Sequence, residues 1–399
     1  MEKNIYLKDE EVKNFSTEEM KTEILDYIRK DIWAEPYIYE CAMVPVPAGS
    51  KMFQSFNNEI QVVKNPDETV IVDPECVIAT EEELDQAEME KTMLFLYPLE
   101  GKMQVYPTRY TAFTSICQRA GLSGTTITNV DSKPAVDALP VIEKAHWLTR
   151  GMSLHKTHCK VLLRDGKISA MLSAEYEILP AYEAVPLLEK ELSEEHPDYK
   201  FISGALSHEY LVLNYVLNDP VMEGSFKLLL ENFGINVNTL SAGVQFTTSD
   251  IGNSMVQAAP YYVVDGLKIR LGKPVGIRHD KGRKMGDFQS ELRKLGMLFK
   301  EAEDQIEKLG NTDIFNPELC FSNIIDAHKT LKFGSDEVLE EIKTDYPAGT
   351  SCTAVDIFFY LNKIIEVRNS KKAMTPTQMI NLSEEIAKFM YIDFKVYDK

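Results

Sequence analysis

The spacing of hydrophobic residues changes along this chain of 399 residues. In the middle of the chain, short apolar runs alternate with turn residues, a pattern that predicts β-strands. The two clearest predicted hairpins turn at Asp165-Gly166 and Asp265-Gly266, because this dipeptide fits the positive φ of a tight turn. From residue 287 onward, apolar residues recur at helical spacing, beginning with one long amphipathic segment at 288–310. The chain therefore combines a strand-rich part with a helical C-terminal part.

Helices are also predicted ahead of these strands. A helix over 17–31 begins with a capping box formed by Ser16 and Glu19. Three more are predicted at 81–93, 110–121 and 134–148, and Gly121 ends the second of them. The charged residues of the helix at 81–93 are mostly acidic, which is typical of a solvated face, with an acidic decoy surface as the weaker alternative.

These elements predict an α+β fold. We expect a mixed or antiparallel sheet core with flanking helices and a C-terminal helical layer. The expected regions are an acidic N-terminal α+β region at 1–100, an α+β core with two Asp-Gly hairpins at 101–286, and a C-terminal helical region at 287–399.

Charge is distributed unevenly over this acidic chain, whose formal net charge is −19. Residues 1–100 contain 23 acidic and 9 basic residues, a net charge of −14. Residues 101–170 contain 10 basic and 4 acidic residues, and residues 266–300 contain 10 basic and 3 acidic residues. Because charges interact over about 10 Å at ordinary salt, these local basic segments are compatible with a polyanionic partner.

The basic stretch VGIRHDKGRKMG at 275–286 is the leading candidate site. Gly276, Gly282 and Gly286 separate its charges, as is typical of a flexible loop that approaches phosphates closely. Flanking residues and the 101–170 segment supply further cations. The candidate nucleic-acid-binding residues are Lys268, Arg270, Arg278, Lys281, Arg283, Lys284, Arg293, Lys294, Arg109, Arg119, Arg150 and Arg164.

Both basic segments also have a purely structural explanation. The charges at 275–286 are equally typical of a solvated loop that pairs with the acidic N-terminal third or with a neighbouring subunit. Aromatic residues near the other segment suit base stacking, but most lie at the helical spacing of core residues. They are Tyr106, Tyr110, Phe113 and Trp147. A groove for a nucleic-acid strand requires both segments to share one exposed face.

The sequence contains no recognisable catalytic or metal-binding motif. His155 and His158 would point to opposite faces of a strand, and no second ligand pair follows at zinc spacing. A nucleophile elbow and a P-loop are both missing. No apolar run approaches the roughly 18 residues of a membrane span, and the six cysteines form no framework. We therefore expect no metal, no cofactor, no membrane association and a cytoplasmic location.

Four stretches resemble the phage/plasmid-like proteins, a family catalogued as a domain of unknown function. YTAFTSICQRAGLSG is similar to the family's early helix, and VLLRDGKISAMLSAEYEIL is similar to its hairpin with a Ser-x-x-Tyr element, here Ser173 to Tyr176. VQFTTSDIGNSM resembles a later strand with Ser-Asp-x-Gly, and TAVDIFFYLNKI resembles a late helix. The resemblance spans about residues 105–370 and departs at Asp265-Gly266, where relatives more often show Cys-x-Asn-Gly. It implies a phage or plasmid context in a bacterial host and supplies no catalytic residues to carry over.

Two functions from different classes follow from these observations. The first is a phage- or plasmid-borne accessory protein that binds nucleic acid, single-stranded rather than duplex, without catalysis, in DNA metabolism or recombination. The alternative is an anti-defence inhibitor that binds a host immune protein through its acidic N-terminal region. An unrecognised metal-dependent enzyme is a third hypothesis, and a homo-oligomer would extend modest basic patches into a track.

Overall fold

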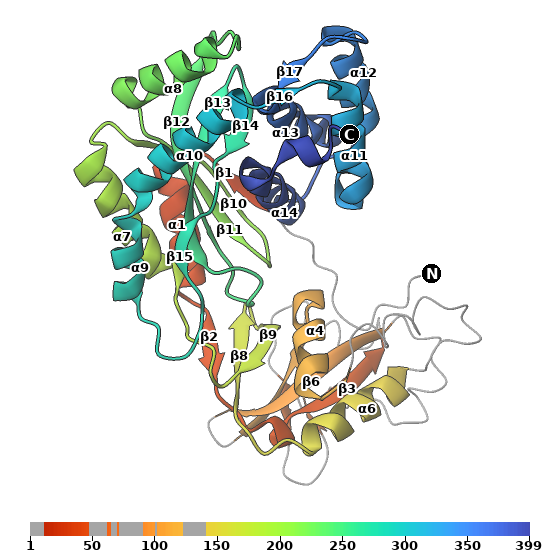
Figure 1. Ribbon diagram of the computed structural model, residues 1–399. Coiled ribbons are helices and arrows are strands. Elements are labelled where there is room, and N and C mark those ends of the chain that lie inside the picture. Colours follow the sequence, from red (N-terminus) through yellow and green to blue (C-terminus); the bar gives the residue numbers. More distant parts are fainter. Residues whose placement is uncertain (1–11, 48–61, 65–69, 72–90, 100–101, 123–140) are drawn as a thin grey trace.

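The computed structural model describes residues 12–47, 62–64, 70–71, 91–99, 102–122 and 141–399. These residues confirm the predicted α+β fold, and the core sheet is antiparallel. The main sheet has seven strands in the order β1-β10-β11-β12-β13-β14, with β15 also paired to β13 (Figure 1). Its strands are β1 (Lys13–Phe15), β10 (Lys200–Leu206), β11 (Leu211–Val216), β12 (Leu240–Thr248), β13 (Val256–Val264), β14 (Leu267–Arg270) and β15 (Val275–Ile277).

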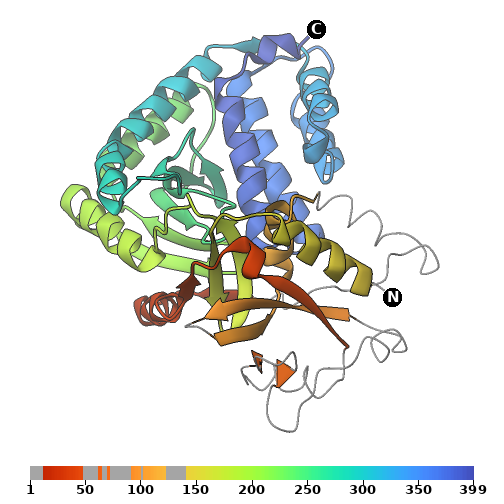
Figure 2. The same ribbon diagram turned by 90° about the horizontal axis from the view of Figure 1, so that it is seen from below.

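One face of the main sheet packs against helices that precede and follow its central strands along the chain. Alternate residues of β13, such as Tyr262, point into this core, and Tyr262 stacks on Phe226 with ring centroids 3.9 Å apart. Figure 2 shows these helices on one side of the strands and the C-terminal helices on the other. The helices are α1 (Glu18–Ile28), α7 (Ala181–Glu195), α8 (Pro220–Asn232), α9 (Met285–Leu292) and α10 (Leu295–Gly310).

The C-terminal helices pack against α10 and cover part of the second sheet face. On that face, Ile380 of α14 contacts Tyr210 and Val212. These elements are α11 (Pro317–Ala327), α12 (Ser335–Asp345), α13 (Ala354–Lys371), α14 (Pro376–Ala387) and the short pair β16 (Asp313–Ile314) and β17 (Cys352–Thr353). Short 3-10 helices are η1 (Ile38–Glu40), η2 (Lys329–Leu331), η3 (Lys388–Tyr391) and η4 (Phe394–Val396).

A smaller part of the chain forms a second core below the main sheet in Figure 1. It contains a three-stranded sheet in the order β2-β8-β9 and a five-stranded sheet in the order β3-β6-β7-β4-β5. The strands are β2 (Ile32–Ala34), β8 (Cys159–Arg164), β9 (Lys167–Ser173), β3 (Ala42–Pro47), β6 (Lys91–Leu99), β7 (Lys102–Pro107), β4 (Val62–Lys64) and β5 (Val70–Ile71). Helices α4 (Tyr110–Arg119) and α6 (Val141–Ser153) complete it.

Both predicted hairpins are confirmed. β8 and β9 pair across Asp165-Gly166, and β13 and β14 pair across Asp265-Gly266. In both turns, the aspartate and the glycine adopt positive φ, at 52° and 64° in the first and 49° and 91° in the second. This is the geometry that the dipeptide predicts.

Several details differ from the sequence expectations. Thr17, and not Ser16, caps α1, because its Oγ1 accepts the Met20 N–H. Residues 91–93 of the predicted acidic helix belong to β6, and the rest of that helix lies outside the described residues. The segment 288–310 is two helices, since α9 packs on α7 and β15 whereas α10 packs on α13 and β13.

The expected domain boundaries near residues 100 and 286 stay a prediction. The described packing crosses the first boundary, because β1 pairs with β10 and β2 pairs with β8. It also crosses the second, because α10 packs on β13 and α13 packs on β14. None of the helices in the described part of the chain has the length and apolar character needed to cross a bilayer.

A candidate anion-binding cleft

Three of the expected binding residues are buried in contacts with the protein's own polar groups. Arg109 NH1 lies 3.1 Å from Ser169 Oγ, and the side chain is 2% exposed. Arg164 and Arg270 are also buried and form ion pairs with carboxylates, described below. In this conformation none of the three reaches an exposed surface.

Lys268 lies on the second face of the main sheet. Its Nζ donates to Asn214 Oδ1 at 2.6 Å and lies 4.1 Å from the centre of the Tyr261 ring. Burial, together with the nearby Arg270 charge, lowers the pKa of Lys268 to about 7. The amine is therefore a poor permanent cation at neutral pH.

Parts of the basic stretch at 275–286 belong to β15 and α9, and its turn contacts carboxylates of the protein itself. Gly276 lies in β15, where an added Cβ would be 2.3 Å from Val256 O, and Gly286 lies in α9. Only Gly282 occupies a turn, with φ at +82°. Its N–H donates to Glu177 Oε1 at 2.8 Å, and Lys281 pairs with Glu175 at 3.4 Å. The turn that was expected to hold phosphates thus contacts two carboxylates of the protein itself.

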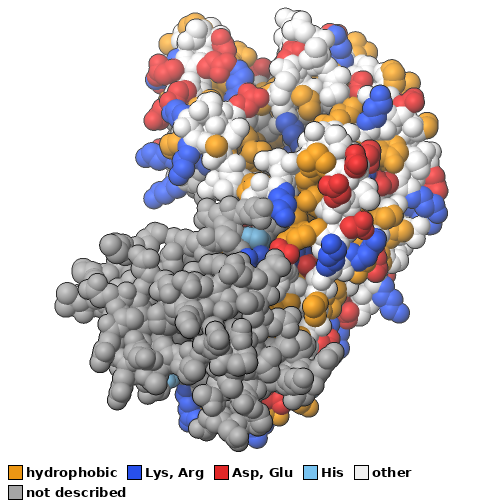
Figure 3. All heavy atoms as spheres, turned by 180° about the vertical axis from the view of Figure 1, so that it is seen from behind, with side chains coloured by type: hydrophobic (Ala, Val, Ile, Leu, Met, Phe, Trp, Pro, Cys, Tyr) orange, Lys and Arg blue, Asp and Glu red, His pale blue; other side chains and the backbone are white. Residues whose placement is uncertain are grey.

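Five of the other expected residues are exposed, of which four flank α9 and one lies on α6. Lys294 pairs with Glu291 at 2.7 Å, and Arg293 follows the end of α9. Arg283 and Lys284 lie in the turn before α9, and Arg150 lies on α6. Figure 3 shows basic side chains interspersed with acidic ones over the described surface on the back of the molecule. The described residues of that face present no continuous basic patch.

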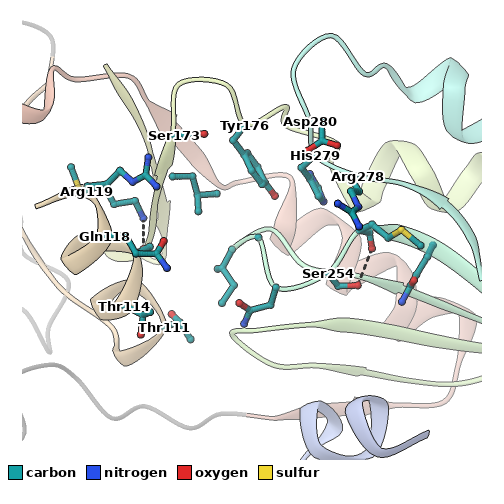
Figure 4. A pocket seen from close by; sticks show the side chains of 18 of the residues that line it. Thr111, Thr114, Gln118, Arg119, Ser173, Tyr176, Ser254, Arg278, His279 and Asp280 are labelled. Atoms are coloured by element: carbon teal, nitrogen blue, oxygen red, sulfur yellow. Dashed lines mark hydrogen bonds between the residues drawn. The ribbon is translucent and has the colours of Figure 1, made fainter. Parts of the chain in front are cut away.

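A cleft of about 600 Å³ lies between the smaller part of the chain and the main sheet. One side is formed by α4 and the end of β9, and the other by the 251–255 loop and residues 278–280 (Figure 4). Gln257 of β13 and Glu384 of α14 complete the lining. The volume falls within the range of about 300–1,000 Å³ that is typical of ligand sites.

Arg119 and Arg278 both line this cleft and come from segments far apart in the sequence. Arg119 is the last residue of α4, and Arg278 directly follows β15 (Figure 4). Neither side chain forms a hydrogen bond or an ion pair with any described residue, and Arg119 Nε is buried without a partner. Two guanidinium groups without a partner among the described residues, in so acidic a protein, indicate a place for an anion.

An aromatic stack supports the wall that carries Arg278. Tyr176 stacks on His279 with ring centroids 4.6 Å apart, and on Trp33 with centroids 5.9 Å apart. The Tyr176 hydroxyl donates to Ser249 O at 3.2 Å. Because the stack joins β2, the 173–180 segment and the 278–280 segment, it fixes the direction in which Arg278 leaves the sheet.

His279 is held as a neutral imidazole. Its Nδ1 lies 2.9 Å from the Glu177 carbonyl oxygen, so Nδ1 carries the proton and Nε2 is an acceptor. Burial lowers the pKa of His279, although the Glu177 carbonyl and the Asp250 charge oppose this shift. Nε2 is buried and has no hydrogen-bond partner among the described residues.

The 249–255 loop is anchored to the smaller part of the chain. Arg164 NH2 lies 2.8 Å from Asp250 Oδ2, and Arg164 Nε lies 3.0 Å from Asp31 Oδ1. Ser249 Oγ accepts the Asn253 N–H at 3.2 Å. Asp250 and Ser249 thus hold the end of β12 and the loop that follows it in place.

The cleft contains residues that sequence reasoning did not select. Gln118, Asn253 and Ser254 add uncharged donors and acceptors to its lining. Their residue types are common on any surface, so only their convergence in space reveals them. The described residues contain no group of three or more histidine, cysteine or carboxylate side chains that could hold a metal ion.

Comparisons with known proteins add no relative. No protein-family model matches the sequence. Neither the curated proteins nor the solved structures include a significant match. The residues of the cleft are therefore the only guide to its function.

Proposed function

We propose that this chain is a non-catalytic accessory protein that binds single-stranded nucleic acid through the cleft between α4 and the 278–280 segment. Arg119 and Arg278 contact successive phosphates from the two sides, and the uncharged lining residues contact sugars and bases. The phage or plasmid setting is part of the proposal and rests on the sequence resemblance alone.

The observation that carries this proposal is a pair of arginines in one cleft that have no partner among the described residues. Most of the other basic residues of the site prediction already contact a carboxylate or another polar group of this chain. Arg119 and Arg278 have no such partner among the described residues. Guanidinium groups bind phosphate through two parallel hydrogen bonds, and an oligonucleotide supplies the missing acceptors.

The size of the cleft favours a single strand. A volume of about 600 Å³ holds a short piece of one strand, whereas a duplex is bound across much wider surfaces. Arg283 and Lys284 continue from Arg278 toward α9 and remain exposed. A strand leaving the cleft in that direction would meet both cations.

A binding titration tests the proposal. Labelled single-stranded DNA and RNA are titrated with the full chain at low and high salt, and fluorescence anisotropy reports binding. We expect binding at low salt, a loss of about tenfold on Arg278→Gln, corresponding to about 1.4 kcal/mol, and no change on Arg150→Gln. Arg150 is an exposed arginine on α6 that does not line the cleft. Absence of binding at low salt would refute the proposal.

The anti-defence alternative is supported by no contact in the described structure. Most of residues 48–90 of its acidic N-terminal region lie outside the described residues. It stays a prediction, and a pull-down that recovers a host protein and no nucleic acid would favour it.

A further inference from the structure

Arg270 is a buried cation whose hydrogen-bonding capacity is largely unused. It is the last residue of β14, it points to the second sheet face, and it is 3% exposed. None of its three guanidinium nitrogens makes a well-oriented hydrogen bond to a described residue. Its one close polar contact in the described part of the chain is Glu384 Oε1, 3.0 Å from NH2. A buried guanidinium with five donors and one approximate acceptor is unusual, because unsatisfied buried donors are costly.

Glu384 is placed on α14 between two cavities. Its Oε1 accepts the Gln257 Nε2–H at 2.8 Å as well as lying beside Arg270, yet its side chain is still 36% exposed. It lines the cleft described above and also a second cavity of about 390 Å³. The carboxylate therefore lies between the cleft and Arg270, which itself lines neither cavity.

The second cavity offers Glu384 another position. Lys388, four residues further along, and His328 both line that cavity. A carboxylate and an amine at this spacing lie on the same helical face and attract each other. A rotation of the Glu384 side chain away from Arg270 therefore leads toward another cation rather than into an apolar region.

We propose that Arg270 and Gln257 form a phosphate-binding subsite of the cleft, and that Glu384 occupies this subsite until a phosphoryl group displaces it. The Glu384 carboxylate stands in for the ligand, because it meets the same two donors that a phosphate oxygen would meet. The subsite rests on the proposed function in one respect, since the phosphoryl group would belong to the bound strand. A phosphate can accept several of the unused Arg270 donors, whereas Glu384 accepts from only one side.

A purely structural role for the same contact makes different predictions. If the Arg270–Glu384 pair only fastens α14 to the sheet, removing the carboxylate lowers stability and creates no affinity for anions. If Glu384 occupies a binding site, removing it exposes that site, and an added anion restores the lost stability. The two roles therefore differ in their response to a small anion.

The experiment compares Glu384→Gln with Glu385→Gln in the full chain. Both remove one negative charge from the same helix, but Glu385 lines only the second cavity. Thermal unfolding is followed with increasing pyrophosphate, and calorimetry gives the affinity. We expect Glu384→Gln to bind pyrophosphate about tenfold more tightly than wild type or Glu385→Gln, with a matching rise in Tm. Equal responses of the two variants would overturn the proposal.

A second variant keeps the test decisive if Glu384→Gln does not fold. Gln257→Leu leaves both Arg270 and Glu384 in place and removes only the amide donor. We expect the pyrophosphate affinity of Gln257→Leu to fall several-fold below that of wild type, and an unchanged affinity would overturn the subsite.

The outcome separates this inference from the proposed function. Pyrophosphate binding to Glu384→Gln without oligonucleotide binding to wild type would support the subsite and refute the proposal that the cleft binds single-stranded nucleic acid. Oligonucleotide binding to wild type, with equal pyrophosphate responses of Glu384→Gln and Glu385→Gln, would support strand binding in the cleft and refute the subsite.

Discussion

Arg164 binds Asp250 across the boundary between the two cores, with NH2 2.8 Å from Asp250 Oδ2. The arginine ends β8, and the aspartate begins the loop that forms one wall of the cleft. Because Asp31 binds the same guanidinium, one buried cation joins three segments. The shape of the cleft depends on this contact as much as on the residues that line it.

Arg164→Met tests the importance of that cation. It would leave Asp31 and Asp250 buried side by side without a counterion, and breaking a buried ion pair in this way costs about 3–5 kcal/mol. We expect the free energy of unfolding, measured in urea, to fall by that order. Arg150→Met, at an exposed position, should change it by less than about 0.5 kcal/mol. Similar small effects for both variants would contradict the arrangement.

Asp31 gives the stability a specific pH dependence. Burial raises the pKa of Asp31 to about 6, although Arg164 opposes the shift. In the unfolded chain an aspartate titrates near pH 3.9, so the folded state binds more protons between about pH 4 and 6. The contribution of Asp31 is thus fully present below about pH 4 and is lost as the pH rises through 6, by about 2–3 kcal/mol.

The Asp31→Asn variant isolates this effect. Between pH 4 and 6.5, we expect the free energy of unfolding of wild type to decrease relative to that of Asp31→Asn, because only wild type has the titrating carboxyl group. A constant difference between the two proteins over this range would show that Asp31 does not titrate there.

Gly243 allows an aromatic ring to cross the sheet. An added Cβ would lie 2.3 Å from Tyr261 Cζ and 2.5 Å from Tyr215 O, and the Tyr261 hydroxyl donates to that same oxygen at 2.9 Å. We expect Gly243→Ala to destabilise the protein by about 1–3 kcal/mol through overpacking. Gly224→Ala is the matched control on α8, where an added Cβ meets nothing within 4 Å. It should stabilise by about 0.5–1 kcal/mol, measured by thermal unfolding.

Lys268 produces the opposite pH dependence to Asp31. Since the pKa of Lys268 is lowered to about 7 by burial, the unfolded chain holds this proton up to about pH 10 and the folded chain does not. Stability should therefore rise with pH between about 7 and 10 through this residue. Allowing for partial exposure, we expect about 1–2 kcal/mol of this rise to disappear in Lys268→Met. The comparison of urea unfolding at pH 7 and 9.5 measures it.

The secondary structure follows from local patterns better than the site does. Asp165-Gly166 and Asp265-Gly266 determine their hairpins because the turn geometry is local. Residue type does not reveal burial, however. Arg109 precedes α4 and is buried against Ser169, whereas Arg119 ends the same helix and faces the cleft. Both are arginines near one short helix, and only the tertiary packing distinguishes them.

The cleft itself is a product of long-range packing. Its walls come from residues 111–119, 171–176, 251–257 and 278–280, with Glu384 added from α14. Summed charge along the sequence points to 266–300 but not to a particular arginine. Glu175 and Glu177, which contact the 281–282 turn, lie about a hundred residues earlier in the chain, so local charge counts cannot include them.

The salt dependence of oligonucleotide binding tests the central claim most directly. Each phosphate neutralised on a single strand contributes about 0.7 to the slope of log K against log salt. We predict that the Arg119→Gln, Arg278→Gln double variant lowers this slope by about 1.4 relative to wild type, while Arg150→Gln leaves it unchanged. Equal slopes for wild type and the double variant would show that these two arginines do not hold one strand.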